Sequence, residues 1–298
     1  MAINSKDEKR MFLKAIGRRL LRGFTRSVPV RGRHRLVRSL GPRLAEQPEM
    51  LCLGGLTVEL DTRLLAPQTM YYGIYEEHLT NWITRTIRAG DAVIEPGMNV
   101  GFITGHLLDR VGPSGVVIAV EPSRSCVEGI RRHNDLTSMP NLRVINAAVA
   151  DDDGTERFRE TPNLVNEGYG CLEAANWSGE HEGRWYDVQT RRVDTLMEEF
   201  GIRRLAFLKL DVEGSELRAL RGAANALRNR AIDHIMVETY FDFDEEAGDA
   251  MRRDIWKLLE SHGMRPHRMN RDGRLQPFAI APGGPRRFML DVMWSLAQ

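Results

Sequence analysis

Apolar and polar residues follow one another along most of the chain in two patterns, short apolar runs and longer amphipathic segments. Apolar runs predict buried strands at 92–95, 116–120, 142–147, 207–210 and 232–238, with two further strands near 264–269 and 286–294. Apolar residues at helical spacing predict helices at 102–110, 124–136, 215–228 and 248–261. Strands that alternate with helices of this length are typical of a parallel sheet with helices on both faces. We therefore expect an α/β fold.

The N-terminal part of the chain has a different pattern. Residues 9–25 predict an amphipathic helix with Phe12, Leu13, Ile16, Leu20 and Phe24 on one face and Lys14, Arg18, Arg19 and Arg22 on the other. One interpretation is that the helix contacts something anionic outside the protein, either a lipid surface or an acidic partner. The other is that it docks on the protein's own acidic body with its arginines in water. Residues 26–48, which contain Pro29, Gly32, Gly41 and Pro42, predict a linker or a loosely packed extension.

The composition is that of a soluble globular protein, with 42% hydrophobic and 28% charged residues. Charge is uneven, because residues 1–45 hold 13 of the 42 Lys and Arg but only two of the 41 Asp and Glu. Three separated cysteines without a Cys-x-x-Cys pair favour a reducing compartment over a disulfide framework or structural zinc. No apolar run approaches the roughly 18–20 residues that cross a bilayer. We expect a cytoplasmic protein, with peripheral contact to a membrane's inner face as one alternative.

The loop after the first predicted core strand indicates a bound cofactor. Glu95 ends that strand, and Gly97, Asn99 and Gly101 follow at alternate positions before the next helix. Glycines allow a ligand to approach the backbone, and the free N–H groups at a helix start face it. Twenty residues after Gly101, Glu121 ends the second core strand, at a distance that suits a carboxylate bound to ribose hydroxyls. The pattern predicts a nucleoside-containing cofactor.

The charge of this loop indicates which nucleoside cofactor it holds. Asn99 stands where a dinucleotide fingerprint has its second glycine. Glu95 would repel a pyrophosphate but attract an α-ammonium group or a sulfonium. S-adenosylmethionine carries both of these cations. The sequence therefore favours S-adenosylmethionine over NAD, and an NAD-dependent oxidoreductase is the weaker alternative.

A second acidic block follows the strand at 207–210. Asp211 ends this strand, Glu213 lies in the turn, and Ser215 suits the N-cap of the next helix. Ligands of open parallel sheets bind beyond the carboxyl ends of the strands, so we expect these acids to face the Gly97 loop. Lys209 lies on the same strand face as Asp211 and needs an ionic partner, either Asp211 or Glu238.

Several blocks in order resemble the FkbM-type S-adenosylmethionine-dependent methyltransferase family. The resemblance runs from Gly73 to Glu238 and rests on residues 95–101, 120–122, 146–151 with Gly154, 193–196 and, above all, 209–216. It implies a Rossmann-like methyltransferase sheet, mostly parallel with an antiparallel final strand. It also implies that the 95–101 loop holds the methionine part of the cofactor and that Glu121 holds the ribose, with Pro122 next to it in the cofactor site. The 146–151 strand end, with Ala148, is implied to lie near the adenine. The family usually has Asp at position 95 and a small residue at position 96.

The resemblance also implies the reaction, O-methylation of a hydroxyl on a sugar, glycolipid or secondary metabolite. A hydroxyl acceptor needs a base, and our catalytic candidates are Asp211 and Glu213 together with Lys209. The alternative is that Asp211 only pairs with Lys209 and Glu213 only caps the turn. Asp211 and Glu238 alone are a thin site for a divalent ion, so we expect no metal. A non-catalytic cofactor-binding module remains the alternative function.

The expected organisation is a basic extension, residues 1–48, and a methyltransferase domain, residues 49–298, with an acceptor-side insertion near 155–187. That insertion has no regular pattern and carries the candidate acceptor-binding side chains Tyr169, Trp177, His181, Trp185 and Tyr186. The partner that we expect is a small-molecule or glycan acceptor. We do not expect nucleic acid, because the body is acidic and the basic segment lacks interleaved aromatic residues.

Overall fold

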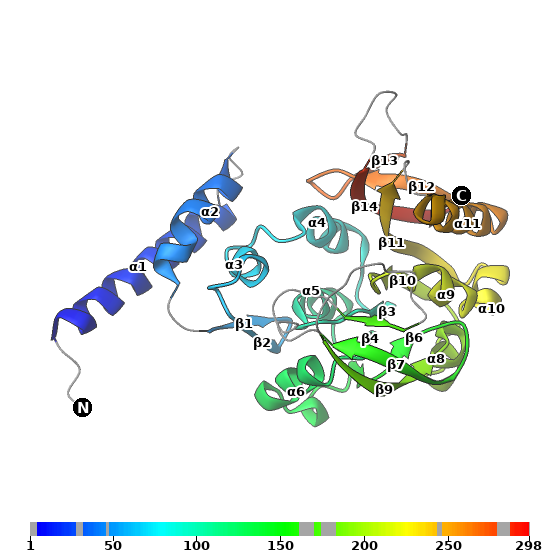
Figure 1. Ribbon diagram of the computed structural model, residues 1–298, viewed down its shortest axis with the longest axis horizontal. Coiled ribbons are helices and arrows are strands. Elements are labelled where there is room, and N and C mark those ends of the chain that lie inside the picture. Colours follow the sequence, from blue (N-terminus) through cyan, green and yellow to red (C-terminus); the bar gives the residue numbers. More distant parts are fainter. Residues whose placement is uncertain are drawn as a thin grey trace.

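The computed structural model describes residues 5–27, 32–45, 48–160, 170–173, 183–242, 246–278 and 287–297. Its centre is an eight-stranded sheet in the order β13-β12-β14-β11-β10-β3-β4-β5 (Figure 1). The strands are β3 (Ala92–Pro96), β4 (Val116–Val120), β5 (Leu142–Ile145), β10 (Leu205–Leu210), β11 (Ile232–Asp242), β12 (Met264–Met269), β13 (Leu275–Pro277) and β14 (Arg287–Leu296). From β5 to β11 neighbouring strands are parallel, and β14 is antiparallel to both β11 and β12. The predicted fold class is confirmed.

Two layers of helices cover the sheet, because its central strands are apolar on both faces. Val93 and Phe207 belong to one hydrophobic cluster, whereas their neighbours Ile94 and Leu208 belong to another. The first cluster includes residues of α4 (Glu77–Thr86), α5 (Phe102–Val111) and α6 (Arg124–His133). The second includes residues of α8 (Val193–Glu199), α9 (Glu216–Arg221), α10 (Ala224–Arg228) and α11 (Glu246–Ser261). A short 3-10 helix, η1 (Leu136–Ser138), follows α6.

The helix predicted at 215–228 is divided into α9 and α10. Gly222 lies at the division, and a Cβ atom there would come within 2.1 Å of the carbonyl oxygen of Ala150. This contact joins segments about 70 residues apart in the sequence, so local periodicity cannot reveal it.

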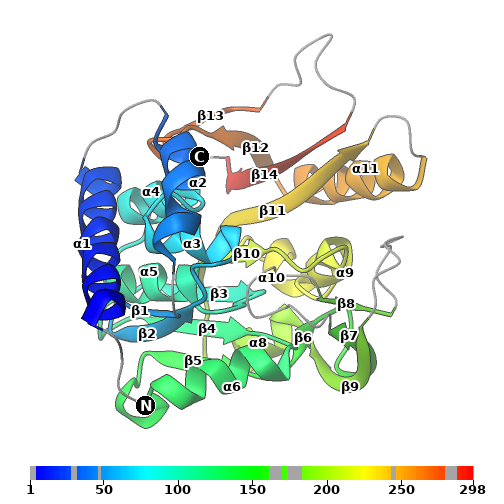
Figure 2. The ribbon, with the colours of Figure 1, turned by 60° about the vertical axis from the view of Figure 1, so that its left-hand side comes forward.

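The basic N-terminal segment is helical and packs on the domain. It comprises α1 (Ser5–Ser27) and α2 (Arg33–Leu44), which lie beside α3 (Leu65–Tyr71) and the hairpin β1 (Glu49–Leu53) and β2 (Leu56–Leu60) (Figure 2). The prediction of a loosely packed extension over 26–48 was wrong for α2. Val37 is fully buried in the main cluster, and Arg33 pairs with Glu77. These tertiary contacts stabilise a helix that Gly41 and Pro42 disfavour locally.

A second, four-stranded sheet replaces the irregular insertion that the sequence suggested. Its order is β6-β9-β7-β8, from β6 (Ala148–Val149), β7 (Gly154–Glu160), β8 (Gly170–Leu172) and β9 (Arg184–Arg191). The expectation of irregular structure was therefore wrong for these strands, while 161–169 and 174–182 lie outside the described residues. The sheet buries only a small cluster that includes Phe158, Leu172 and Val188, so its sequence lacks the long apolar runs of the central strands.

Candidate functional site

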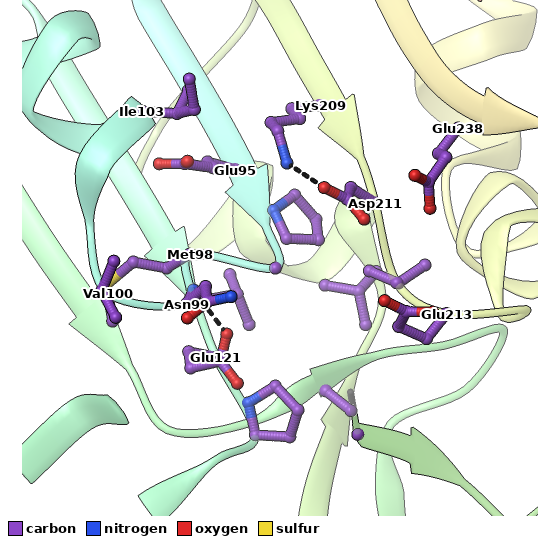
Figure 3. A pocket seen from close by; sticks show the side chains of 18 of the residues that line it. Glu95, Met98, Asn99, Val100, Ile103, Glu121, Lys209, Asp211, Glu213 and Glu238 are labelled. Atoms are coloured by element: carbon purple, nitrogen blue, oxygen red, sulfur yellow. Dashed lines mark hydrogen bonds and ion pairs between the residues drawn. The ribbon is translucent and has the colours of Figure 1, made fainter. Parts of the chain in front are cut away.

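A cavity of about 290 Å³ lies at the ends of β3, β4 and β10 and beside β11 (Figure 3). The chain goes from β3 to β4 and β5 on one side and adds β10 on the other side of β3, so this is the switch point of the sheet. The structure brings nine of the ten predicted site residues to this cavity, namely Glu95, Gly97, Asn99, Glu121, Pro122, Ala148, Lys209, Asp211 and Glu213. Gly101 is not among the residues that line it.

The two loop glycines serve backbone geometry. Both have positive φ, +79° at Gly97 and +84° at Gly101. A Cβ atom at Gly97 would come within 2.0 Å of the carbonyl oxygen of Asp211, and one at Gly101 would come within 2.8 Å of Ile130. Gly97 thus allows the acidic ends of β3 and β10 to touch, whereas Gly101 begins α5 and packs away from the cavity.

Glu121 binds a backbone N–H group of the Gly97 loop, the kind of donor that a dinucleotide pyrophosphate uses. Its Oε2 accepts a hydrogen bond from the Asn99 backbone N–H and its Oε1 accepts one from the Ser123 N–H, both at 2.8 Å. Burial raises the pKa of this carboxyl to about 7, although the two hydrogen bonds oppose the shift. Each carboxylate oxygen has a further lone pair, so Glu121 can still accept hydrogen bonds from ribose hydroxyls. A diphosphate would meet its negative charge.

Glu95 is fully buried and only half satisfied. Its Oε2 accepts a 2.7 Å hydrogen bond from the Thr104 hydroxyl, whereas its Oε1 has no hydrogen-bond partner among the described residues. Burial raises the pKa of Glu95 to about 8. A buried carboxylate oxygen without a donor is costly, and a cationic donor in the cavity would satisfy it. This geometry fits an α-ammonium group, one of the two cations that the sequence predicted beside Glu95.

Lys209 pairs with Asp211 through a 2.7 Å contact between Nζ and Oδ2. Of the two partners that the sequence left open, the structure therefore selects Asp211 over Glu238. Burial opposes the charge of Lys209, which is 2% exposed, but Asp211, Glu76 and Glu95 together raise its pKa above the ordinary value. The ammonium of Lys209 is thus a fixed positive charge that lies near Asp211 and near Glu76 and Glu95.

Three carboxyl groups form the side of the cavity opposite the Gly97 loop. Asp211, Glu213 and Glu238 have carboxylate oxygens within 4.8 Å of one another (Figure 3). Burial, together with the charge of Asp211, raises the pKa of Glu213 to about 8 and also raises that of Glu238. Asp211 and Glu238, predicted at neighbouring strand ends, do lie together, and Glu213 of the turn lies with them. Such a group can accept a proton or bind a cation.

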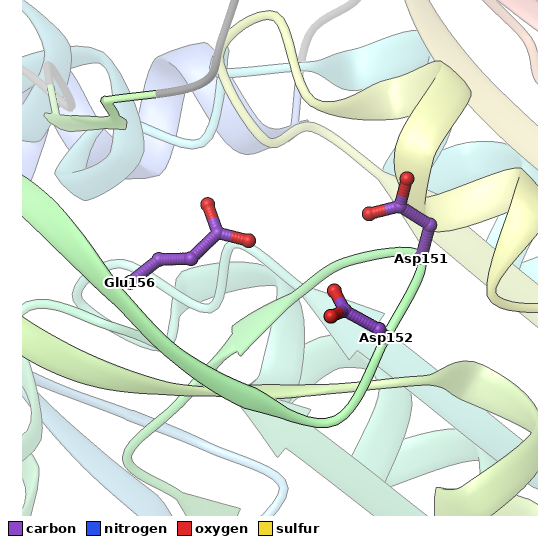
Figure 4. Close-up of side chains that lie close together, drawn as sticks. All are labelled: Asp151, Asp152 and Glu156. Carbon is purple, nitrogen blue, oxygen red and sulfur yellow. The ribbon is translucent and has the colours of Figure 1, made fainter.

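A second group of acids, Asp151, Asp152 and Glu156, lies close together (Figure 4), and Arg218 is its counter-ion. Arg218 Nη2 lies 2.6 Å from Asp151 and 2.5 Å from Glu156. The strand end at 146–151, predicted to lie near the adenine, therefore contributes Ala148 to the cavity, whereas Asp151 pairs with Arg218.

The second sheet closes the cavity with other residues than those predicted. Phe158, Gly170 and Leu172 line it, whereas Trp185 and Tyr186 do not. Tyr186 donates a 2.9 Å hydrogen bond to Glu160, which also accepts one of 2.6 Å from Ser123 at the start of α6. This network positions the sheet over the cofactor side. Tyr169, Trp177 and His181 lie outside the described residues.

Sequence reasoning also missed Glu76 as a cavity residue. It lines the cavity with φ 41°, and its Oε2 is buried without a hydrogen-bond partner among the described residues. The available signal was its position near the first residues of the family resemblance.

The family model that describes the methyltransferase FkbM domain matches residues 96–266 of this chain. The chain belongs to the FkbM methyltransferase family. A curated relative, Methyltransferase sdnD of Sordaria araneosa, is 23% identical over 220 residues, 66% of this chain and 81% of that protein. The solved methyltransferase FkbM from Methylobacillus flagellatus KT is 13% identical, with a TM-score of 0.39 over 77% of this chain and 54% of that one. TYW2 of M. jannaschii, solved in complex with AdoMet, is 10% identical, with a TM-score of 0.42 over 85% and 88%.

The cavity fits the cofactor of a methyltransferase. Six carboxyl groups, but only one basic side chain, that of Lys209, are found among the residues that line it. S-adenosylmethionine carries a sulfonium and an α-ammonium, so this excess of acids attracts it. Glu95 would hold the ammonium and Glu121 the ribose, with Pro122 beside Glu121, and Ala148 would lie near the adenine. When bound, the cofactor supplies the methyl group.

Proposed function

We propose that the protein transfers a methyl group from S-adenosylmethionine to a hydroxyl of a sugar, glycolipid or secondary metabolite. The observation that supports a hydroxyl acceptor is the group formed by Asp211, Glu213 and Glu238, which faces the cofactor side of the same cavity. A hydroxyl must lose its proton as its oxygen bonds the methyl carbon, and a base with a pKa near the working pH does this best. Glu213, whose pKa burial raises to about 8, meets this requirement.

The neighbouring residues would orient this reaction. Lys209 holds one oxygen of Asp211, so the other oxygen is free to position the acceptor hydroxyl. Glu213 then takes the proton while the oxygen attacks in line, from roughly 3–3.5 Å. Phe158 and Leu172 on the second sheet help to exclude water from the reacting atoms. We also propose a cytoplasmic location, which the three free cysteines support.

Incubation of cell extracts with methyl-labelled S-adenosylmethionine tests the proposal. We expect a labelled product with the native protein, much less with Glu213→Gln, and the native amount with the control Glu128→Gln, an exposed acid on α6. A methyl ether survives mild alkali, whereas a methyl ester is hydrolysed. Label released by alkali would contradict a hydroxyl acceptor. Cofactor binding without any labelled product would favour the non-catalytic module instead.

A further inference from the structure

Helix α1 is attached to the body of the protein along one side. Leu21 and Thr25 are buried there, and the Thr25 hydroxyl donates a 2.7 Å hydrogen bond to the carbonyl of Tyr72. The guanidinium of Arg22 lies over the ring of Tyr71, 4.7 Å from its centre. These contacts determine which side of α1 faces outward.

The opposite side of α1 carries large apolar side chains in the open. We call Phe12 (67% exposed), Leu13 (67%), Ile16 (39%), Leu20 (68%) and Phe24 (41%) the outer stripe. At about 100° per residue they cover roughly a third of the helix circumference. Docking on the protein, one of the alternatives for α1, does occur, but through the side that bears Leu21 and Thr25. The expectation that the arginines lie in water was wrong for two of them, because Arg18 pairs with Glu49 and Arg22 lies over Tyr71. In the described part of the chain the outer stripe has no cover.

Positive charge borders the outer stripe. Residues 11–45 contain ten Lys and Arg and no Asp or Glu. Arg19 and Arg26 are exposed on α1, and Arg35 and Arg38 are exposed on α2, which packs against it. A second copy docked stripe to stripe would bring two basic surfaces together, and like charges repel. An anionic surface complements both the charge and the apolar stripe.

We propose that α1 is an interfacial helix that holds the protein on an anionic lipid bilayer. The outer stripe enters the boundary of the acyl chains, and the bordering arginines contact headgroup phosphates. No described helix is long and apolar enough to cross a membrane, so α1 lies in the plane of the surface. It forms the outer edge of the molecule in two views (Figures 1 and 2), where a flat bilayer can reach its whole length.

Helix α3 connects this surface with the cavity. Tyr71 in α3 and Tyr72 just after it hold α1, and Ala66 and Met70 of the same helix line the cavity. In a protein bound through α1, helix α3 therefore contacts both the membrane-bound helix and the cavity. An acceptor hydroxyl on a lipid-anchored molecule would suit this arrangement, and this last point rests on the proposed function.

Vesicle cosedimentation with the full-length protein tests the interfacial helix. We expect binding to phosphatidylcholine vesicles that contain phosphatidylglycerol, weaker binding to phosphatidylcholine alone, and loss of binding as salt increases. Leu20→Asp should lower the vesicle-bound fraction by roughly tenfold or more. The matched control is Trp185→Asp, an exposed apolar residue on β9, far from α1 (Figure 2). Arg19→Glu should also weaken binding, whereas Arg228→Glu on α10 should not.

Three results would overturn the proposal. The first is the absence of vesicle binding at low salt, and the second is equal binding by the native protein and Leu20→Asp. The third is a dimer in sedimentation velocity that Leu20→Asp dissociates, because a second copy would then cover the stripe. Vesicle binding needs neither cofactor nor turnover, so its failure leaves the methyltransferase proposal untouched.

Discussion

Replacing Glu95 with glutamine should stabilise the folded protein while it weakens cofactor binding. Glu95 is fully buried, and one of its carboxylate oxygens has no partner among the described residues. Burial raises its pKa from 4.5 to about 8. Between these two values the folded protein holds a proton that the unfolded chain has released. Stability therefore falls as the pH rises through this window.

The size of this loss of stability follows from the shift in the pKa of Glu95. One pKa unit corresponds to about 1.4 kcal/mol, so at about pH 7 this carboxyl lowers the free energy of unfolding by about 3 kcal/mol relative to low pH. Glu95→Gln cannot titrate and keeps an oxygen that can accept the Thr104 hydroxyl. We expect the free energy of unfolding of the variant to exceed that of the native protein by up to about 3 kcal/mol at about pH 7. This difference should vanish near the ordinary pKa of a glutamate.

Urea unfolding followed by circular dichroism, from about pH 4.5 to about pH 8, measures this difference. Glu128→Gln, which removes an exposed carboxyl, is the control and should change little. Calorimetry with S-adenosylmethionine should show weaker binding by Glu95→Gln, because the ammonium loses its carboxylate. A difference in stability that is the same at every pH would refute the reasoning. So would a variant less stable than the native protein at neutral pH.

Three further predictions concern the cavity. Glu121→Ala should weaken S-adenosylmethionine binding in calorimetry by about tenfold or more, since hydrogen bonds to a charged group are lost; unchanged affinity would contradict the ribose assignment. The native methylation rate should fall as the pH drops below about 8, where Glu213 becomes protonated. Glu213→Gln should lower turnover by about a hundredfold or more without this pH dependence and with unchanged cofactor affinity. Treatment with EDTA should leave activity unchanged, because Lys209 already neutralises Asp211; activity lost and then restored by Mg²⁺ would show a cation between the three acids.

Local patterns were sufficient for the central strands and for much of the cavity. The apolar runs at 92–95 and 207–210 appear as β3 and β10, each followed by its acids. The pairing of Lys209 with Asp211 was also accessible, because residues two apart on a strand share a face. Charge alone argued against a pyrophosphate beside Glu95, and the Asn99 N–H bound to Glu121 explains how the loop excludes one.

Other features of the protein depend on contacts between distant segments. Glu238, which the sequence placed near Asp211, joins the cavity because β11 pairs with β10. Glu76 joins it from the N-cap of α4, and only its position in the family resemblance pointed to it. The need for glycine at position 97 also depends on a distant segment, because Gly97 faces the backbone of Asp211 at the end of the neighbouring strand β10. The second sheet buries too few residues to produce an apolar run. Burial and charge pairing at these places are properties of neighbours in space.

The sequence by itself determined the parallel sheet, the acidic loop, the family and an amphipathic α1, because each depends on short motifs or periodic patterns of residues that are close together along the chain. Only the tertiary structure decided which side of α1 docks and which remains open. Periodicity reveals that a helix has two faces. The contacts of Leu21, Thr25 and Arg22 with the body select the one that faces inward, and they leave the outer stripe in solvent.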